Sequence, residues 1–343
     1  MRYLMPAEWE PHEGTWLAWP HNVSHWPGKF EPTPLVYVKI IRAIAESEKV
    51  FVCVNDQKME DLAKSYLKHA EFPTELMKNV FLFHIPTDAS WSRDHGPIFV
   101  RDTASGKLLI TDWIFNAWGD KYRPYAQDDV VPQHVGKLLG MVVVEPKFVL
   151  EGGSIEVNGQ GTLLTTEQCL LNKNRNPQFT REQIEDYLNR YLGAKKILWL
   201  KEGIMGDDTD GHIDDIARFV AADTVVCAVE ENPKDENYKV LQECYKDLQK
   251  MTDQDGKLLK VIPVPMPEPV IHDGERLPAS YVNFLITNKS VLVPTFRSKK
   301  YDTKALKIIG DCFPDRKVVG IDCWDFVWGL GTIHCSTQQQ PRE

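Results

Sequence analysis

Four short segments of this chain carry side chains whose types suit attack on a cationic carbon. The C-terminal run GTIHCSTQQQP places Cys335 among small polar residues, where its thiol can act as a nucleophile. The segment WSRDHGP contributes Asp94, LEGGS contributes Glu151, and DDTDGHID contributes His212 and Asp214. Together they supply a thiol, an imidazole and three carboxylates, which are the groups needed to hold and attack a guanidinium carbon.

Each of these residues also has an ordinary structural interpretation. A single cysteine is usually a small buried hydrophobic residue, and the acidic run around His212 could be a solvated turn. A calcium loop of the EF-hand type does not fit, because Gly206 and Ala217 stand where a loop aligned on Gly211 needs acidic ligands. Zinc is disfavoured, because no cysteine pair has C-x-x-C spacing and no H-E-x-x-H helix occurs. We therefore expect a metal-free site without a cofactor.

Two of the ten tryptophans stand apart from the rest, for which core packing is the default interpretation. Trp91 lies three residues before Asp94. An aromatic face beside a carboxylate can bind a flat cation by stacking and by a charge-assisted hydrogen bond. We expect Trp91 and Trp118 to bind substrate, whereas Arg93 is expected to be a surface or ion-paired residue.

Composition narrows the class of protein. The chain has 343 residues, of which 43% are hydrophobic, and a formal net charge of -9, which disfavours nucleic acid and anionic membranes as partners. Seven cysteines without paired spacing predict a reduced, cytoplasmic protein. The N-terminus has no apolar signal-peptide core, and no apolar stretch approaches the roughly 18 residues of a membrane span. We expect neither export nor membrane insertion.

A unit of hairpin, helix and strand recurs along the chain without sequence identity. The clearest helix begins after Thr180, which forms a capping box with Gln183, and ends at Gly193, before a strand at 196–200. Similar helix and strand pairs are predicted at 236–251 with 261–264 and at 303–313 with 317–321. Hairpins are predicted where alternating apolar runs flank short polar turns, at 97–100 with 108–114, 154–157 with 162–165, 216–220 with 224–229, and 281–286 with 290–294.

Polar residues stand near the first strand of successive units, which suits a ring of units that face one axis. An open mixed sheet with polar residues at its turns is the alternative. Closure of the ring is favoured by the unpaired run 14–20, which we expect to pair with 332–337 so that no sheet edge stays open. No long linker divides the chain, so a single catalytic domain over 1–343 is preferred.

The chain resembles the agmatine deiminase and bacterial-type peptidylarginine deiminase family, within the guanidine-modifying enzyme superfamily. The resemblance covers nearly the whole chain and implies an α/β fold, a five-fold pseudosymmetric α/β propeller of the pentein type. It is carried in order by MPAEWEPH (5–12), FNAWG (115–119), LEGGS (150–154), GTLLTTEQCLLNKNRNP (161–177), DDTDGHID (207–214), ASYVNF (279–284) and HCSTQQQP (334–341).

The family pattern implies a role for each matching residue. Cys335 would be the nucleophile, His212 the general acid and base, and Asp94 and Asp214 the guanidinium ligands, while Glu151 would orient His212 and help to bind substrate. The sequence departs from the agmatine deiminase pattern at three positions near these residues, where Ser92, His95 and Ser336 stand.

The resemblance implies hydrolysis of agmatine, a small guanidine, to N-carbamoylputrescine and ammonia through a covalent thiouronium on Cys335, as in polyamine biosynthesis from putrescine precursors. A peptidylarginine or free-arginine deiminase, which produces citrulline, is the alternative assignment. An amidinotransferase and a non-catalytic guanidinium-binding protein also stay open. The sequence is compatible with a homo-oligomer.

Overall fold

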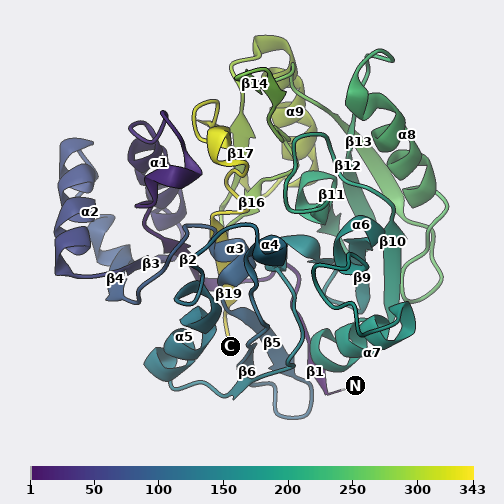
Figure 1. The fold of residues 1–343 in the computed structure, drawn as a ribbon, viewed down its shortest axis with the longest axis horizontal. Helices are drawn as coiled ribbons and strands as arrows, with labels where there is room; N and C mark the ends of the chain where they lie inside the picture. The colour runs from purple at the N-terminus through teal and green to yellow at the C-terminus, as the bar shows by residue number, and fades with distance from the viewer. Residues whose placement is uncertain (1) are drawn as a thin grey trace.

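The computed structural model describes residues 2–343, which form an α/β fold. Small β-sheets occupy the interior, and the longer helices lie around the periphery (Figure 1). Among the described residues, no helix is long and apolar enough to cross a membrane.

Five sheets in the described part of the chain share one pairing pattern. The first two strands pair antiparallel, and the third pairs parallel with the second after a helical crossover. In chain order of the crossovers, the strands are β19 (Thr337–Pro341), β2 (His12–Ala18) and β3 (Lys49–Val54); β5 (Ile98–Asp102), β6 (Leu108–Thr111) and β7 (Val143–Val144); β8 (Glu156–Val157), β9 (Thr162–Thr166) and β10 (Lys196–Leu200); β11 (Ala217–Ala221), β12 (Thr224–Val229) and β13 (Lys260–Pro265); β16 (Leu285–Ile286), β17 (Ser290–Thr295) and β18 (Lys317–Asp322).

One helix of nine or more residues lies in each crossover. These helices are α1 (Thr33–Ala45), α5 (Val131–Leu139), α7 (Arg181–Leu192), α8 (Glu236–Leu248) and α9 (Lys299–Cys312). The remaining elements extend the sheets or lie in connections: β1 (Tyr3–Leu4), α2 (Gln57–His69), β4 (Val80–His84), α3 (Ser92–His95), α4 (Ala117–Asp120), α6 (Glu167–Leu170), and a two-stranded hairpin of β14 (Ile271–His272) and β15 (Glu275–Arg276).

The predicted hairpins and helices are present because local chemistry specifies them. At α7, the side chains of Thr180 and Gln183 form the expected capping box, and Gly193 ends the helix with a left-handed φ of 74°. Its apolar face buries Ile184 and Leu188, one turn apart. The fourth hairpin is shorter than predicted, because only Leu285–Ile286 of the run 281–286 pairs with β17.

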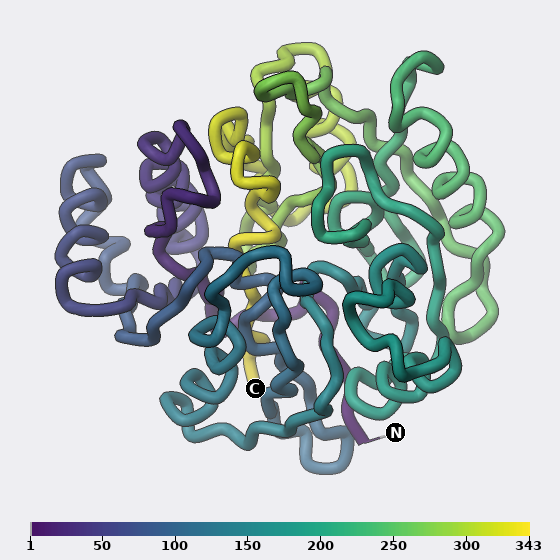
Figure 2. Tube along the Cα trace, viewed as in Figure 1, coloured from purple at the N-terminus to yellow at the C-terminus, as the bar shows by residue number. Residues whose placement is uncertain are grey.

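The N-terminal run pairs with the C-terminus as expected, but the predicted C-terminal partner was wrong. β2 pairs antiparallel with β19, from Thr337 opposite Leu17 to Pro341 opposite His12, and Figure 2 shows these purple and yellow segments side by side. Residues 333–336 form a turn rather than a strand, in which the Thr337 amide bonds the carbonyl of His334 at 3.0 Å. This turn carries Cys335 directly ahead of β19.

Candidate active site

All five predicted catalytic residues lie in segments that directly precede the first strand of a unit. Because these segments come from four different units, the fold brings together residues far apart in sequence. They are Asp94 in α3 ahead of β5, Glu151 ahead of the 3-10 helix Gly152–Ser154 and β8, His212 and Asp214 ahead of β11, and Cys335 ahead of β19. The fifth unit contributes Asn283 ahead of β16.

The sulfur of Cys335 has a fixed hydrogen-bond donor. The Asn283 amide nitrogen lies 3.1 Å from the sulfur. Its amide oxygen accepts from the Thr332 hydroxyl at 2.6 Å and from the backbone N–H groups of His334 and Cys335 at 3.1 and 3.4 Å. Three donors on the oxygen settle the orientation of the amide, so the nitrogen must face the sulfur. Asn283 was not among the residues predicted to act in the site.

The thiol lies among carboxylates. Burial, followed by the charges of Asp214, Asp215 and Asp94, raises the pKa of Cys335 well above that of an ordinary thiol. The same crowding raises the pKa of Asp215, chiefly through burial and then through Asp214. Without a bound cation the sulfur therefore keeps its proton, and a cation in this site would lower the thiol pKa. The sequence analysis missed Asp215, because it stands in a long acidic run.

Asp94 is held by two donors from other segments. The Gly153 amide bonds its Oδ1 at 3.0 Å, and the Trp118 indole bonds its Oδ2 at 3.0 Å. Burial raises the pKa of Asp94 to about 7, although the nearby His212 imidazole acts in the opposite direction. A Cβ at Gly153 would lie 2.5 Å from His212 Nδ1 and 2.7 Å from Asp94 Oδ1. Only glycine permits this close approach.

A strained turn positions Trp118. Ala117, Trp118, Gly119 and Asp120 have consecutive positive φ values of 51°, 56°, 90° and 66°. Three of these residues are not glycine, so the left-handed backbone costs about 1 kcal/mol or more at each. The turn is held by the Asn116 side chain, which accepts from the Gly119 amide at 2.9 Å. Such strain at a site that orients a carboxylate indicates a functional constraint.

His212 lies near the carboxylates of Asp94 and Glu151. Its Nδ1 is 3.7 Å from Asp94 Oδ1, and its Nε2 is buried without a hydrogen-bond partner among the described residues. Burial opposes protonation, but Asp94, Cys169 and Glu151 outweigh it and raise the pKa of His212 well above its ordinary value. This shift favours the protonated imidazole, which can donate a proton.

Glu151 is oriented by a buried arginine that the sequence analysis missed. Arg175 bonds Glu151 Oε1 at 2.6 Å, and its other nitrogens bond Asp210 Oδ2 and the Thr209 carbonyl at 2.8 and 2.9 Å. The second oxygen of Glu151 is buried without a partner among the described residues. Arg175 thus connects Glu151 to the loop that leads into His212. Arg175 lies in the segment NKNRNP, whose composition gave no sign of this contact.

Asp214 also offers one free oxygen. Its Oδ2 accepts from the Cys335 thiol at 3.8 Å and lies 2.7 Å from His334 Nδ1. Its Oδ1 is buried and has no partner among residues 2–343. Burial opposes ionisation, but the hydrogen bond and charge of His334 lower the pKa of Asp214. Free oxygens on Glu151 and Asp214, together with Asp94, make a set of acceptors suited to the N–H groups of a guanidinium.

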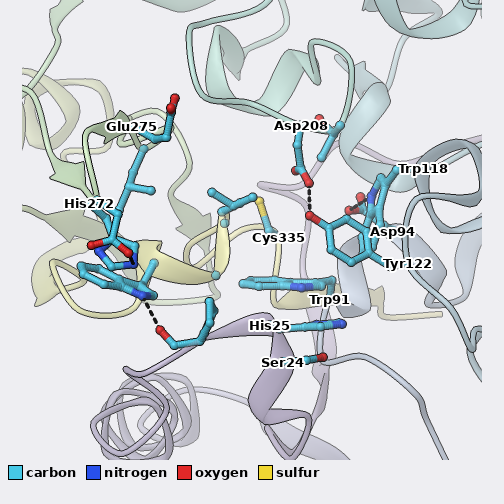
Figure 3. A pocket seen from close by; sticks show the side chains of 18 residues that line it. Ser24, His25, Trp91, Asp94, Trp118, Tyr122, Asp208, His272, Glu275 and Cys335 are labelled. Atoms are coloured by element: carbon cyan, nitrogen blue, oxygen red, sulfur yellow. Dashed lines mark hydrogen bonds and ion pairs between the residues drawn. The ribbon is translucent and has the colours of Figure 1, made fainter.

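A pocket of about 290 Å³ opens onto the thiol. Cys335 and Asp94 line its buried end, and Figure 3 shows the Trp91 ring below the sulfur with Trp118 to one side. Trp91 packs against Trp26, with ring centroids 5.1 Å apart. A Cβ at Gly331 would lie 2.9 Å from the Trp91 ring, so this glycine admits the ring beside the thiol.

The outer part of the pocket is acidic. Asp208, Asp273 and Glu275 line it, and no lysine or arginine of the described chain does. Asp208 accepts a short hydrogen bond from the Tyr122 hydroxyl, which Figure 3 marks by a dashed line. Trp328 adds an apolar wall. The pocket therefore suits a ligand that is cationic at both ends and apolar between them.

Among residues 2–343, two groups of three side chains have metal-binding atoms within 4.8 Å of one another. They are Glu151, Cys169 and His212, and Asp214, Asp215 and Cys335. Arg175 lies on the first group, and both groups contain residues already suited to a guanidinium. The same atoms can therefore bind an organic cation in place of a metal ion.

Sequence and structure comparisons identify relatives over the whole chain. A family model described as Porphyromonas-type peptidyl-arginine deiminase matches residues 4–341. An agmatine deiminase of Medicago truncatula is 37% identical, over 99% of this chain and 96% of the relative.

Solved structures agree with this assignment. The agmatine deiminase of Enterococcus faecalis superposes with a TM-score of 0.92 at 36% identity, over 99% of this chain and 96% of that chain. A cysteine-to-serine variant of the C. jejuni agmatine deiminase with substrate bound superposes with a TM-score of 0.89 at 32% identity, over the same shares. This chain belongs to the Porphyromonas-type peptidyl-arginine deiminase family.

Proposed function

We propose that this protein hydrolyses agmatine to N-carbamoylputrescine and ammonia, with Cys335 as a covalent nucleophile. The observation that carries the substrate assignment is the lining of the pocket, which has a buried thiol at one end, carboxylates along its length, and no lysine or arginine among residues 2–343. Agmatine is a guanidinium joined to a primary ammonium by a methylene chain. Both of its ends are cations, and its middle is apolar, as this pocket requires.

In the proposed complex, Asp94 and Asp214 accept the N–H groups of the guanidinium and hold its carbon against sulfur. Trp91 packs on the flat face of the cation. Such orientation lowers the barrier, because the reacting atoms meet without further loss of freedom. The bound cation also opposes the carboxylates that raise the thiol pKa, so the Cys335 proton is released to solvent and Asn283 donates to the thiolate.

The thiolate then adds to the guanidinium carbon, which gives a neutral tetrahedral intermediate. Protonated His212 gives its proton to a terminal nitrogen, the carbon–nitrogen bond breaks, and ammonia leaves a cationic thiouronium on Cys335. Neutral His212 next removes a proton from water, whose oxygen adds to the same carbon. Collapse of this second intermediate breaks the carbon–sulfur bond, and the hydroxyl proton passes to the departing sulfur, so the ureido product is released and Cys335 returns to its thiol form.

The far end of the substrate is assigned to Asp208. This side chain is partly buried, lies on the outer wall of the pocket and is fixed by Tyr122. The α-carboxylate of free arginine would enter the same acidic region without a cationic partner, and an unpaired buried charge costs several kcal/mol. Agmatine lacks that carboxylate. A peptidylarginine deiminase or free-arginine deiminase, producing citrulline, is the competing assignment.

Steady-state kcat/KM values for agmatine, free arginine and a peptidyl arginine test this proposal, scored as ureido product and ammonia. We expect agmatine to exceed both others by at least about 100-fold, since discrimination by unpaired polar groups reaches that size. Butylguanidine, which lacks the ammonium, is the matched control. Asp208→Asn should raise the KM for agmatine and leave that for butylguanidine unchanged. Equal kcat/KM values for agmatine and arginine, or a preference for the peptide, would overturn the assignment.

The remaining features of the protein are proposed on the same basis. The five sheets with one pairing pattern support a five-fold pseudosymmetric α/β propeller. In one of these sheets, β2 from the N-terminal part of the chain pairs with the C-terminal strand β19. The pairing of the N-terminal β2 with the C-terminal β19 supports a single catalytic domain over 1–343. We further propose a cytoplasmic enzyme with a small-molecule guanidine partner and no metal or other cofactor, compatible with a homo-oligomer.

A further inference from the structure

His334, the residue directly before the nucleophile, lies between two buried carboxylates. Its Nδ1 is 2.7 Å from Asp214 Oδ2, and its Nε2 is 2.9 Å from Glu8 Oε2. All three side chains are at least 95% buried, with exposed fractions of 1% for His334, 0% for Asp214 and 5% for Glu8. Neither Glu8 nor His334 touches the pocket that holds the thiol.

Hydrogen-bond counting shows which atoms hold the protons. Glu8 Oε2 also accepts from Arg218 Nη2 at 2.7 Å, and Glu8 Oε1 accepts from the Ile286 amide at 2.7 Å. Both oxygens of Glu8 therefore accept, and the hydrogen bond to His334 needs a proton on Nε2. Asp214 is ionised, so the bond to Nδ1 needs a second ring proton. Both nitrogens must donate, which only an imidazolium does.

Charge counting gives the same answer. The buried cluster contains three carboxylates, Glu8, Glu156 and Asp214, and two guanidinium groups, Arg93 and Arg218. Both oxygens of Glu156 accept, from Arg218 Nε and the Phe219 amide at 2.7 and 2.9 Å, which favours its ionised form although burial raises its pKa to about 7. With all three carboxylates ionised, one further positive charge makes the cluster neutral, and a protonated His334 supplies it.

Burial and the two guanidinium groups act against this charge and lower the pKa of His334. Burial and the guanidinium groups oppose the charge on His334, but they place no other hydrogen-bond donor between the ring and either carboxylate. A neutral ring would leave one nitrogen lone pair facing an ionised oxygen at less than 3 Å, which is repulsive. The hydrogen-bond geometry therefore favours the protonated ring of His334.

We propose that His334 is a positioning residue, a doubly bonded imidazolium that fixes Asp214 so that Oδ1 faces the substrate guanidinium. The inference rests on the proposed function for its kinetic consequence, but the protonation of the ring does not. Because His334 and Cys335 are adjacent and both bond Asn283 through their backbone amides, the turn that presents the nucleophile also sets the direction of its substrate ligand.

The first experiment measures the protonation state of the His334 ring in the wild-type protein. With nitrogen-15 histidine at pH 8, where an ordinary imidazole is neutral, two N–H protons coupled to one ring should persist in slow exchange with solvent. Asp214→Asn should shift the Nδ1–H signal, which assigns it to His334. A ring with one N–H proton at this position would overturn the proposal, whatever the substrate of the enzyme is.

The second experiment separates positioning from general damage. His334→Gln should raise the KM for agmatine and lower kcat/KM by about 10- to 150-fold, the factor for one hydrogen bond to a charged group. His12→Gln is the matched control, because His12 is 1% exposed and bonds Glu48 and the Glu8 carbonyl but not Asp214. A merely structural role would reduce the folded fraction, and hence kcat alone, in both variants. An unchanged KM in folded His334→Gln would refute the positioning role. If agmatine is not turned over by the wild type, the proposed function fails and the ring measurement still decides this inference.

Discussion

Replacement of Asn283 by aspartate tests how the thiolate of Cys335 is stabilised. The substitution keeps the oxygen that accepts from Thr332, His334 and Cys335, and it replaces the nitrogen that lies 3.1 Å from sulfur with an oxygen. The sulfur then loses its donor and gains a neighbouring acceptor or negative charge. We expect the thiolate to be disfavoured while the turn that carries Cys335 keeps its shape.

A hydrogen bond to a charged group contributes about 1.5–3 kcal/mol, so its loss should lower the thiolate fraction by about 10- to 150-fold. The assay is the rate of alkylation by iodoacetamide at pH 8 without substrate, with Cys335 identified by peptide mapping. Cys335 is the one described cysteine that lines the pocket, so the mapped rate at Cys335 is the relevant quantity. The reaction of the thiolate, not of the thiol, determines this rate.

Asn158→Asp is the matched control for Asn283→Asp. Asn158 is also buried and also uses both ends of its amide, with its oxygen on the Gln160 and Thr162 amides and its nitrogen on the Ala222 carbonyl. It lies in the turn between β8 and β9 and bonds no residue of the site. Equal alkylation rates in wild type and Asn283→Asp, or an equal loss in both variants, would refute the reasoning.

Three further predictions concern binding and catalysis. Cys335→Ala should abolish turnover yet still bind agmatine in calorimetry, since the carboxylates remain; turnover above about a tenth of wild type would exclude covalent catalysis. In the same variant, binding should tighten about 10-fold from pH 6 to pH 8, because Asp94, with its pKa raised to about 7, holds the cation only when ionised. Equal affinity for agmatine at pH 6 and pH 8 would contradict this role of Asp94. Gly153→Ala should lower kcat/KM by at least about 10-fold, because the new Cβ meets His212 and Asp94; wild-type kinetics would show that the close approach is not required.

The local structure of this protein was predictable because short-range chemistry specifies it. The capping box at Thr180 and the stop at Gly193 gave α7, and alternating apolar runs gave the antiparallel pairs, since both depend on neighbouring residues. The turn at 333–336 was not predicted, because its bonds to Asn283 come from 50 or more residues away. Spacing along the chain carries no information on such contacts.

The same limit applies to the site. Cys335, His212, Glu151, Asp94 and Asp214 were predicted by residue type and by resemblance, and the fold brings them together. The contacts of their supporting partners were not predicted, although the resemblance included the segments that carry these partners. Arg175 touches Glu151 from 24 positions away, Trp118 bonds Asp94 from 24 positions away, and Glu8 reaches His334 across 326 positions. Those contacts exist only in the folded chain.

Intact-protein mass spectrometry of the His212→Gln variant tests whether Cys335 forms a covalent thiouronium with agmatine. This variant lacks the group that activates water, so an adduct formed at a slow rate should accumulate after mixing with agmatine and quenching in acid. We expect a mass increase equal to agmatine less ammonia, mapped to the peptide with Cys335 and absent from a variant that also carries Cys335→Ala. Release of ammonia by the His212→Gln variant itself with no adduct on Cys335, or an adduct on another cysteine, would exclude covalent catalysis by Cys335.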